Sequence, residues 1–426
     1  MKRLAGRIRA GELTPREAVE EYLARIEAHA DLNAYITVRE EALDEADGAP
    51  DGPLHGLPVA VKDVIDVAGT RTTAGSKILS GNVPDRDATV VARLRAAGAV
   101  ILGKLNTHEF AYGATTTSAH FGPARNPHDP DRIAGGSSGG SGVAAAADLA
   151  AGTLGTDTAG SIRIPACFCG VVGLRPTAGV VPADGVVPTA WSFDTVGPIA
   201  RSAEDCALLL AAIGSGPVAL TAPGRLRIGL VTPLFERADP RIAALVEEAA
   251  AGLGQTEPVT PPLLDEAGVI QQLIMLPEAT TAHLPWLRTR LADYGADVRA
   301  RLLAGLLLPA TAYPTGLRAR RWYLDELKPV LDRYDLLAAP AMPMLPPLIE
   351  EDALPYRRAL IPFNSPWSLA GLPTASVPCG LVDGLPVGVA LVGRPFADAM
   401  VLSAARAIDG APAEVVYKGQ SVSKGV

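Results

Sequence analysis

The chain has 426 residues, of which 48% are hydrophobic, 20% charged and 5% aromatic. This length and apolar content exclude a small binding module and a disordered chain, despite 43 glycines and 37 prolines. The 38 basic and 46 acidic residues give a net charge of −8, and no basic run is present. We therefore expect no electrostatic binding of nucleic acid.

Four cysteines in a chain of this length do not indicate a disulfide framework. Cys167 and Cys169 lack His or Cys partners at zinc-site spacing, so we expect no metal. No apolar run follows the charges at the N-terminus, and the alanine-rich stretches are too short to span a membrane. These features predict a cytoplasmic protein that contacts no membrane.

The first predicted element is an amphipathic helix. Thr14, Pro15 and Glu17 form a capping box with proline at the first helical position, and apolar residues follow at helical spacing. After a Gly- and Pro-rich loop, residues 58–61 form an apolar run with Lys62 at its end. Such a run predicts a buried strand.

A helix followed by a strand comes next. Asp87 is placed to cap a helix that ends at Gly98, and residues 100–102 predict a strand. Helix and strand signals alternate in this way up to about Leu210, which predicts an α/β fold.

The later part of the chain is different. Residues 263–331 have a mostly helical pattern, with breaks expected at Pro277, Pro285, Pro309 and Pro314. Residues 381–387 predict a hairpin around an Asp-Gly turn. We find no internal repeat and no linker long enough to divide the chain, so we expect one domain.

Two glycine-rich segments are the strongest candidates for a functional site. The first is 135–142 (GGSSGGSG), before an alanine-rich helix, and the second is 155–165 (GTDTAGSIRIP). Glycines let backbone amides approach a ligand closely, and hydroxyl groups among them indicate a nucleophile beside an anion-binding pocket.

Three mechanisms compete for these segments. A phosphate-binding loop would need a Gly-Lys-Ser/Thr ending, which neither segment has. Residues 135–139 match the G-x-S-x-G nucleophile elbow, but its base would be a later histidine, and only His283 follows, in a helical stretch. A serine served by a lysine is the third, because burial can lower a lysine's pKa enough to make it a base. Lys62 and Lys104, each at a strand end, are both candidates.

Together these motifs resemble the amidase signature family. The resemblance covers about residues 12–205 and returns at 363–393, and its core is Asn126-Pro127, the two glycine–serine segments and 169–177 (CGVVGLRPT). It implies a single α/β domain over 1–426, with a twisted mixed β-sheet between layers of helices. The core motif would lie in about 55–205 and a variable helical pocket region in about 263–331.

The resemblance also assigns roles position by position. It implies that Ser161 is the nucleophile that forms an acyl-enzyme, that Ser137 is a bridging serine on a cis peptide bond, and that Lys62, not Lys104, is the general base. The implied oxyanion hole consists of the backbone N–H groups of Thr158, Ala159, Gly160 and Ser161. The residues expected to support these loops are Gly136, Ser138, Asp157 and Arg163.

The substrate is less well defined by the sequence. Ile164 is apolar, where relatives that act on malonamate have arginine and the transamidating subunit of the tRNA amidotransferase usually has glutamine. We therefore expect neutral, fairly apolar substrates: aliphatic or aryl amides, anilides or carbamates (urethanes), with esters cleaved as side substrates. Met275 and Trp286 are candidate pocket residues, and simple helix packing explains them equally well.

Two other functions remain open. The chain could be the glutamyl-tRNA(Gln) amidotransferase subunit that releases ammonia from glutamine, which would need partner subunits, or a catalytically inert binding protein on the same fold. For the hydrolase we expect a small-molecule amide or carbamate substrate, no cofactor, and a monomer or homodimer. The tail after Gly410 receives no role.

Overall fold

The computed structural model describes residues 1–214 and 216–409. The tail after Gly410 lies outside these residues. The α-helices are α1 (Lys2–Arg9), α2 (Pro15–Ala28), α3 (Ala42–Asp47), α4 (Thr89–Ala96), α5 (Gly139–Ala146), α6 (Arg163–Cys169), α7 (Ala203–Ile213), α8 (Thr232–Glu236), α9 (Pro240–Leu253), α10 (Glu266–Thr289), α11 (Ala296–Leu306), α12 (Ala312–Arg333), α13 (Ala353–Ala370) and α14 (Asp398–Asp409). Within the described ranges, none of these helices is both long and apolar enough to cross a membrane.

The strands are β1 (Tyr35–Val38), β2 (Pro58–Lys62), β3 (Val100–Leu105), β4 (Thr117–Ser118), β5 (Gly122–Pro123), β6 (Arg125–Asn126), β7 (Asp129–Ile133), β8 (Gly152–Asp157), β9 (Val172–Arg175), β10 (Thr195–Ala200), β11 (Leu226–Val231), β12 (Gly254–Val259), β13 (Leu336–Pro340), β14 (Thr374–Val382) and β15 (Leu385–Val392). Eleven of them form one sheet, in the order β1-β3-β2-β8-β10-β9-β14-β15-β13-β11-β12. Strand β2 is parallel to β3 and β8, and β11 is parallel to β12 and β13, while the other neighbours are antiparallel. The sheet is therefore mixed, as predicted.

Several local signals in the sequence are confirmed. The Glu17 N–H donates to Thr14 Oγ1 at 3.2 Å and the Thr14 N–H donates to Glu17 Oε2 at 2.7 Å, which completes the capping box of α2. The hairpin joins β14 to β15 through Asp383 and Gly384, both of which have positive φ. Two consecutive residues with positive φ are typical of a type I′ turn.

Other local predictions were wrong. Helix α4 has Ala88, not Asp87, as its N-cap, because the Asp87 carboxylate accepts the Ala68 N–H at 2.8 Å and pairs with Arg95 at 3.1 Å. These contacts occupy the carboxylate that the sequence predicted as the helix cap.

The four prolines expected as breaks behave differently from one another. Pro277 and Pro285 lie inside α10, which continues through both because it packs along α11, α12 and α13. Pro309 lies between α11 and α12, and Pro314 lies in the first turn of α12, where a missing N–H costs little.

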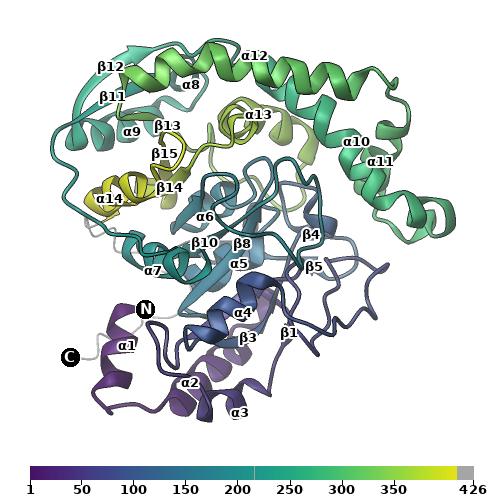
Figure 1. Cartoon of the computed structure of the whole chain (residues 1–426), viewed down its shortest axis with the longest axis vertical. Helices are drawn as coiled ribbons and strands as arrows, with labels where there is room; N and C mark the ends of the chain where they lie inside the picture. Colours follow the sequence, from purple (N-terminus) through teal and green to yellow (C-terminus); the bar gives the residue numbers. More distant parts are fainter. Residues whose placement is uncertain (215, 410–426) are drawn as a thin grey trace.

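Helices cover the sheet in two groups. Helices α5 and α6 contact each other and pack on β2, β8 and β14. Helix α14 contacts both α7 and α9, and these three helices pack on β9, β10 and β13–β15. Figure 1 shows α10, α11 and α12 grouped at the end of the molecule away from α1, α2 and α3. This arrangement is the predicted mixed α/β sheet between helix layers.

The sheet order places the strand that ends at Lys62 next to the strand that leads into the second glycine–serine segment. Strands β2 and β8 are parallel neighbours, so their carboxyl ends lie at the same edge of the sheet. Lys62 is the last residue of β2, and the loop 158–161 follows directly after β8. Ligands in α/β sheets are bound beyond such carboxyl ends.

Candidate active site

Lys62 is fully buried at the end of β2. Its amino group donates hydrogen bonds to Ser137 Oγ at 2.7 Å and to Thr156 Oγ1 at 2.8 Å. Burial lowers the pKa of Lys62 to about 7, although the carboxylates of Asp194 and Asp157 act in the opposite direction. A substantial fraction of this lysine is therefore neutral at pH 7, as a base must be.

Lys104, the rival base, has different surroundings. It is also buried, but its amino group pairs with Asp63 at 3.1 Å and donates to Thr72 Oγ1 at 2.6 Å. Burial lowers the pKa of Lys104 as well, but the adjacent Asp63 carboxylate opposes this shift, and removing the proton would leave a buried anion without a partner. Lys104 therefore has a structural ion pair where Lys62 has two hydroxyls.

Ser137 follows the cis peptide bond Gly136–Ser137. Its carbonyl accepts three hydrogen bonds from one segment of chain: from Thr107 Oγ1 at 3.0 Å, the His108 N–H at 3.1 Å and Thr116 Oγ1 at 3.2 Å. Residues 107–116, which the sequence did not single out, thus fix the backbone that presents the Ser137 hydroxyl to Lys62.

Ser138 joins the two glycine–serine segments. Its hydroxyl donates to the Thr156 carbonyl at 3.1 Å and accepts from the Thr156 N–H at 3.2 Å. Its own N–H donates to the Ser161 carbonyl at 3.2 Å. Helix α5 also lies directly against Asn106, the residue after β3. This contact requires a glycine at position 140, since a Cβ there would lie 2.4 Å from the Asn106 nitrogen.

Asp157 orders the loop that carries Ser161. Its carboxylate accepts from the Gly160 N–H at 2.8 Å and from Arg163 at 2.9 and 3.0 Å, and it pairs with Arg175 at 3.2 Å. Burial alone would raise the pKa of Asp157, but the two guanidinium groups outweigh it and hold the pKa well below its usual range. The loop is thus anchored by a buried anion between two buried cations.

The hydrogen bond from Gly160 corrects the predicted oxyanion hole. The Gly160 N–H is already taken by Asp157, so it is not available to a substrate oxygen. The N–H groups of Thr158, Ala159 and Ser161 have no recorded acceptor in the described part of the chain. Gly160 is needed for another reason: its φ is +116°, and a Cβ would lie 2.6 Å from the Asn364 side chain.

Two supports of this loop were missed from the sequence. Asp194 accepts the Thr158 hydroxyl at 2.6 Å, and Gln271 of α10 donates to the Thr158 carbonyl at 3.0 Å. Burial raises the pKa of Asp194 to about 6. Neither residue lies in a glycine-rich segment, and no sequence pattern marks them, because their role depends on a contact between distant elements.

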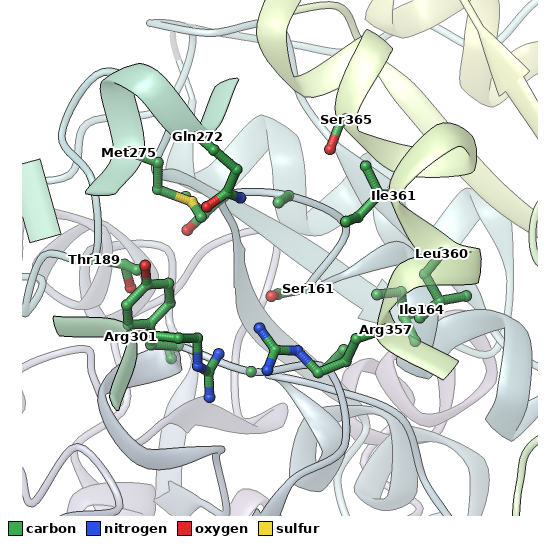
Figure 2. Close-up of a pocket in the computed structure, with 16 residues that line it drawn as sticks. Ser161, Ile164, Thr189, Gln272, Met275, Arg301, Arg357, Leu360, Ile361 and Ser365 are labelled. Carbon is green, nitrogen blue, oxygen red and sulfur yellow. The ribbon is translucent and has the colours of Figure 1, made fainter. Parts of the chain in front are cut away.

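Ser161 is 8% exposed and opens onto a cavity of about 110 Å³. The cavity is lined by Ala111, Tyr112, Gly113, Ala114, Thr158, Ala159, Ser161, Ile164, Thr189, Gln272, Met275, Arg301, Arg357, Leu360, Ile361 and Ser365. Figure 2 shows the Ser161 hydroxyl near its centre, with Ile164 and Leu360 on one side and Met275 and Gln272 on the other. Ile164 and Met275, two of the candidate pocket residues, therefore both line the cavity onto which Ser161 opens.

Trp286 does not line this cavity. Its ring stacks on Phe110 with centroids 5.7 Å apart and meets the edge of His283 at 5.5 Å. Trp286 thus packs against other aromatic side chains. This is the alternative to a pocket role that its helical spacing left open.

Two arginines in the lining were also missed. Arg301 comes from α11 and Arg357 from α13, elements with no glycine-rich or hydroxyl-bearing motif. In Figure 2 the two guanidinium groups point toward one another, and both lie below Ser161 in this view. The predicted apolar pocket is therefore apolar on part of its wall only.

The site has the parts of a serine hydrolase without a histidine: a hydroxyl on the cavity, a buried lysine of lowered pKa, and backbone N–H groups beside them. Among the described residues no three His, Cys, Asp or Glu side chains are grouped to hold a metal ion. The family model for amidases matches residues 17–402.

Relatives agree with this match. The chain is 40% identical to AtzE, named as part of the 1-carboxybiuret hydrolase of Pseudomonas sp. (strain ADP), over 94% of this chain and 96% of that protein. It is 38% identical to the A subunit of the glutamyl-tRNA(Gln) amidotransferase of Moorella thermoacetica, over 93% of each. A crystal structure of an amidase superposes with a TM-score of 0.89 at 35% identity, covering 95% and 97% of the two chains.

The fold and the matches define a hydrolase of carbon–nitrogen bonds. The chain belongs to the amidase family.

Proposed function

We propose that this protein hydrolyses small amides through an acyl-enzyme on Ser161, with Ser137 as the bridging serine and Lys62 as the base. The observation that carries the proposal is the 2.7 Å hydrogen bond between Lys62 and Ser137, made by a fully buried lysine whose pKa is about 7. Lysine in this state accepts a proton at neutral pH, and Ser161 lies on the cavity.

The reaction would proceed as a relay. Neutral Lys62 takes a proton through the Ser137 hydroxyl while Ser161 attacks the amide carbonyl. The N–H groups of Thr158, Ala159 and Ser161 stabilise the oxyanion, a contribution that can reach about 10² to 10³ in rate per donor. Ser137 then returns a proton to the leaving amine, and water repeats the route to release the acid.

The apolar part of the lining supports the substrate class expected from the sequence. Ile164, Leu360, Ile361 and Met275 suit the carbon skeleton of an aliphatic or aryl acyl group. Amides, anilides and carbamates (urethanes) all offer a carbonyl to attack and an amine to expel, and esters would be side substrates. We propose a cytoplasmic monomer or homodimer acting on such a small molecule.

A second candidate is the glutaminase subunit of a tRNA amidotransferase. The observation that favours it is the 38% identity to the A subunit of such an enzyme. That function requires partner subunits, and the two relatives described above are both named as subunits. The third candidate, an inert binding protein, does not explain why Lys62 is buried against Ser137.

Hydrolysis by the purified protein alone separates these candidates. A panel of an aliphatic amide, an anilide, an aryl carbamate and glutamine would be compared with Ser161→Ala. Turnover of an amide or carbamate that disappears in Ser161→Ala supports the proposal. Activity on glutamine only, or only when partner subunits have been added, favours the amidotransferase, and binding without turnover favours the inert protein.

A further inference from the structure

Asp194 is a half-buried residue that the relay described above does not use. One oxygen of its carboxylate accepts the Thr158 hydroxyl at 2.6 Å, and the other accepts the N–H groups of Thr189 and Ala190 at 2.8 and 2.9 Å. All three donors are neutral, and within residues 1–214 and 216–409 Asp194 takes part in no recorded ion pair. A carboxylate held in this way keeps its charge available to a cation nearby.

The chain on both sides of Asp194 is attached next to Lys62. The segment before it begins at Val187, whose N–H donates at 2.8 Å to the carbonyl of Val64, two residues after Lys62. The strand after it, β10, pairs with β8, and β8 contains Thr156, the residue whose hydroxyl accepts from Lys62 at 2.8 Å. Burial lowers the pKa of Lys62, and the Asp194 carboxylate opposes this shift. Lys62 is therefore the cation that Asp194 acts on.

Two carboxylates act on Lys62, and they differ in their own partners. Asp157 pairs with Arg163 at 2.9 Å and with Arg175 at 3.2 Å. The two guanidinium groups cancel most of the field of Asp157 at Lys62, because opposite charges at short range act on a third group almost as a neutral pair. Asp194 has only neutral donors. Its negative charge is therefore the one that reaches Lys62.

The other charged groups around Asp194 do not act on Lys62. They are Arg175 of β9, which donates to the Phe193 carbonyl at 3.0 Å, Glu278 of α10, which accepts the Ser192 N–H at 3.0 Å, and Arg320 of α12, which lies over the Phe193 ring. No hydrogen bond joins any of these three to Asp194 in the described chain, and none is among the charges that shift the pKa of Lys62. A change of charge at Asp194 is therefore read directly at Lys62.

We propose that Asp194 is a positioning residue of the relay: it stabilises the ammonium form of Lys62 that arises during acyl transfer, and it holds the oxyanion loop through the Thr158 hydroxyl. The inference rests on the proposed function and deepens it, since Asp194 acts through the base and touches no substrate atom. It also explains why one carboxylate binds both the loop after β8 and the segment that leads to β10.

The need for such a group follows from the proton transfers. As the Ser161 oxygen forms its bond to the amide carbon, the carbonyl oxygen becomes an anion, and the Ser161 proton moves through Ser137 to the Lys62 amine. This places a positive charge on a buried group that has only hydroxyls beside it, which is costly unless an anion compensates. When the C–N bond breaks, the proton returns through Ser137 to the leaving nitrogen, and Lys62 is neutral again.

The first test is the pH dependence of kcat/KM for a neutral amide on the purified full chain. In Asp194→Asn the ammonium form of Lys62 loses its stabilising anion, so the pKa of Lys62 falls. The limb of the profile that rises with pH should therefore move about one pH unit lower, and the plateau should fall about tenfold because Lys62 is then a weaker base. A merely structural role would lower the activity without moving the limb. An unmoved limb would overturn the proposal.

Further variants assign the shift to the charge of Asp194. Asp194→Glu keeps the negative charge, so its limb should lie closer to that of wild type than the limb of Asp194→Asn does. Glu278→Gln is the matched control, because it removes a buried carboxylate that binds Ser192 of the same segment but does not act on Lys62. Equal shifts in Asp194→Asn and in either of these variants would overturn the proposal. Asp194→Ser, with the same expected shift, replaces Asp194→Asn if that variant does not fold.

A direct titration of Lys62 separates this inference from the proposed function. NMR of Ser161→Ala with isotope-labelled lysine follows the Cε of Lys62, whose signal is assigned by its loss in Lys62→Met. If wild type hydrolyses no amide and no ester, the catalytic assignment fails, and this titration alone decides on Asp194. A pKa of Lys62 that is about one unit lower after Asp194→Asn has been added supports the link between the two residues. An equal pKa in the two proteins overturns it.

Discussion

Two regions of the molecule meet at the cavity, and they are built differently. The motif core, residues 55–205, holds its polar groups in a buried and closely paired network, with Asp157 between Arg163 and Arg175 and Lys62 between two hydroxyls. The helical region, 263–331, exposes large apolar residues such as Leu307, which is 84% exposed. It contributes Gln272, Met275 and Arg301 to the cavity.

The two regions therefore have different functions: the motif core supplies the reacting groups, and the helical region supplies part of the wall around the substrate. Groups that must keep a fixed geometry come from the core, where a change in one partner leaves a buried charge behind. The helical region adds Gln272, Met275 and Arg301 to the cavity wall, beside the core's Ile164. Substitutions in the core should therefore remove the reaction, and substitutions in the helices should redirect it.

The largest effect is expected from Ser161→Ala. Removal of the nucleophile should lower kcat on the best amide by at least about 10⁴-fold, while the cavity still binds the substrate. Steady-state kinetics, with circular dichroism to confirm folding, measures this. Retention of even a tenth of wild-type activity would contradict the assignment of Ser161.

The pH dependence comes next. Because the base must be neutral and the pKa of Lys62 is about 7, kcat/KM should rise about tenfold per pH unit below 7 and level off above it. Lys62→Arg, which stays charged, should be inactive over the whole range. A profile that falls as the pH rises through 7 would mean that protonated Lys62 is the active form.

Asp157→Asn should act on stability. The change leaves Arg163 and Arg175 buried without their counter-charge, which we expect to cost about 3–5 kcal/mol of unfolding free energy. Denaturant unfolding measures it, with Asp332→Asn, which breaks an exposed pair on α12, as control. A loss no greater than the control's would show that the core tolerates the unpaired arginines.

Gln271→Met gives the smallest effect and tests where the two regions join. It removes the hydrogen bond to the Thr158 carbonyl, together with a buried side-chain oxygen that has no recorded partner. We expect kcat to fall about tenfold through misplacement of the oxyanion loop, without loss of thermal stability. A parallel fall in melting temperature would mean that Gln271 only holds the fold.

The sequence predicted the core better than the cavity, for a physical reason. The capping box of α2, strand β2 ending at Lys62 and the β14–β15 hairpin depend on neighbouring residues, and all were confirmed. Arg301 and Arg357 face one cavity only because α11 and α13 pack around it, and no local pattern reports that.

The errors have the same origin. The Asp87 carboxylate binds the Ala68 N–H and Arg95, and Trp286 packs against Phe110 and His283. The Gly160 N–H donates to a carboxylate in its own loop. In the first two cases a contact outside the helix concerned, with Ala68 or with Phe110, takes part in a role that the local pattern does not show. In the third, the spacing was right but the direction of the N–H could not be read from residue types.

The order of the strands also sets the order in which a growing chain can complete the sheet. Strand β9 lies between β10 and β14, so until residues 374–382 leave the ribosome it has an unpaired edge. An open edge of this kind can pair with another chain. Helix α13, which supplies Arg357, lies just before β14 in the sequence, so it is also synthesised late. The N-terminal half therefore carries Lys62, Ser137 and Ser161 before the sheet is complete and before the cavity has its full lining.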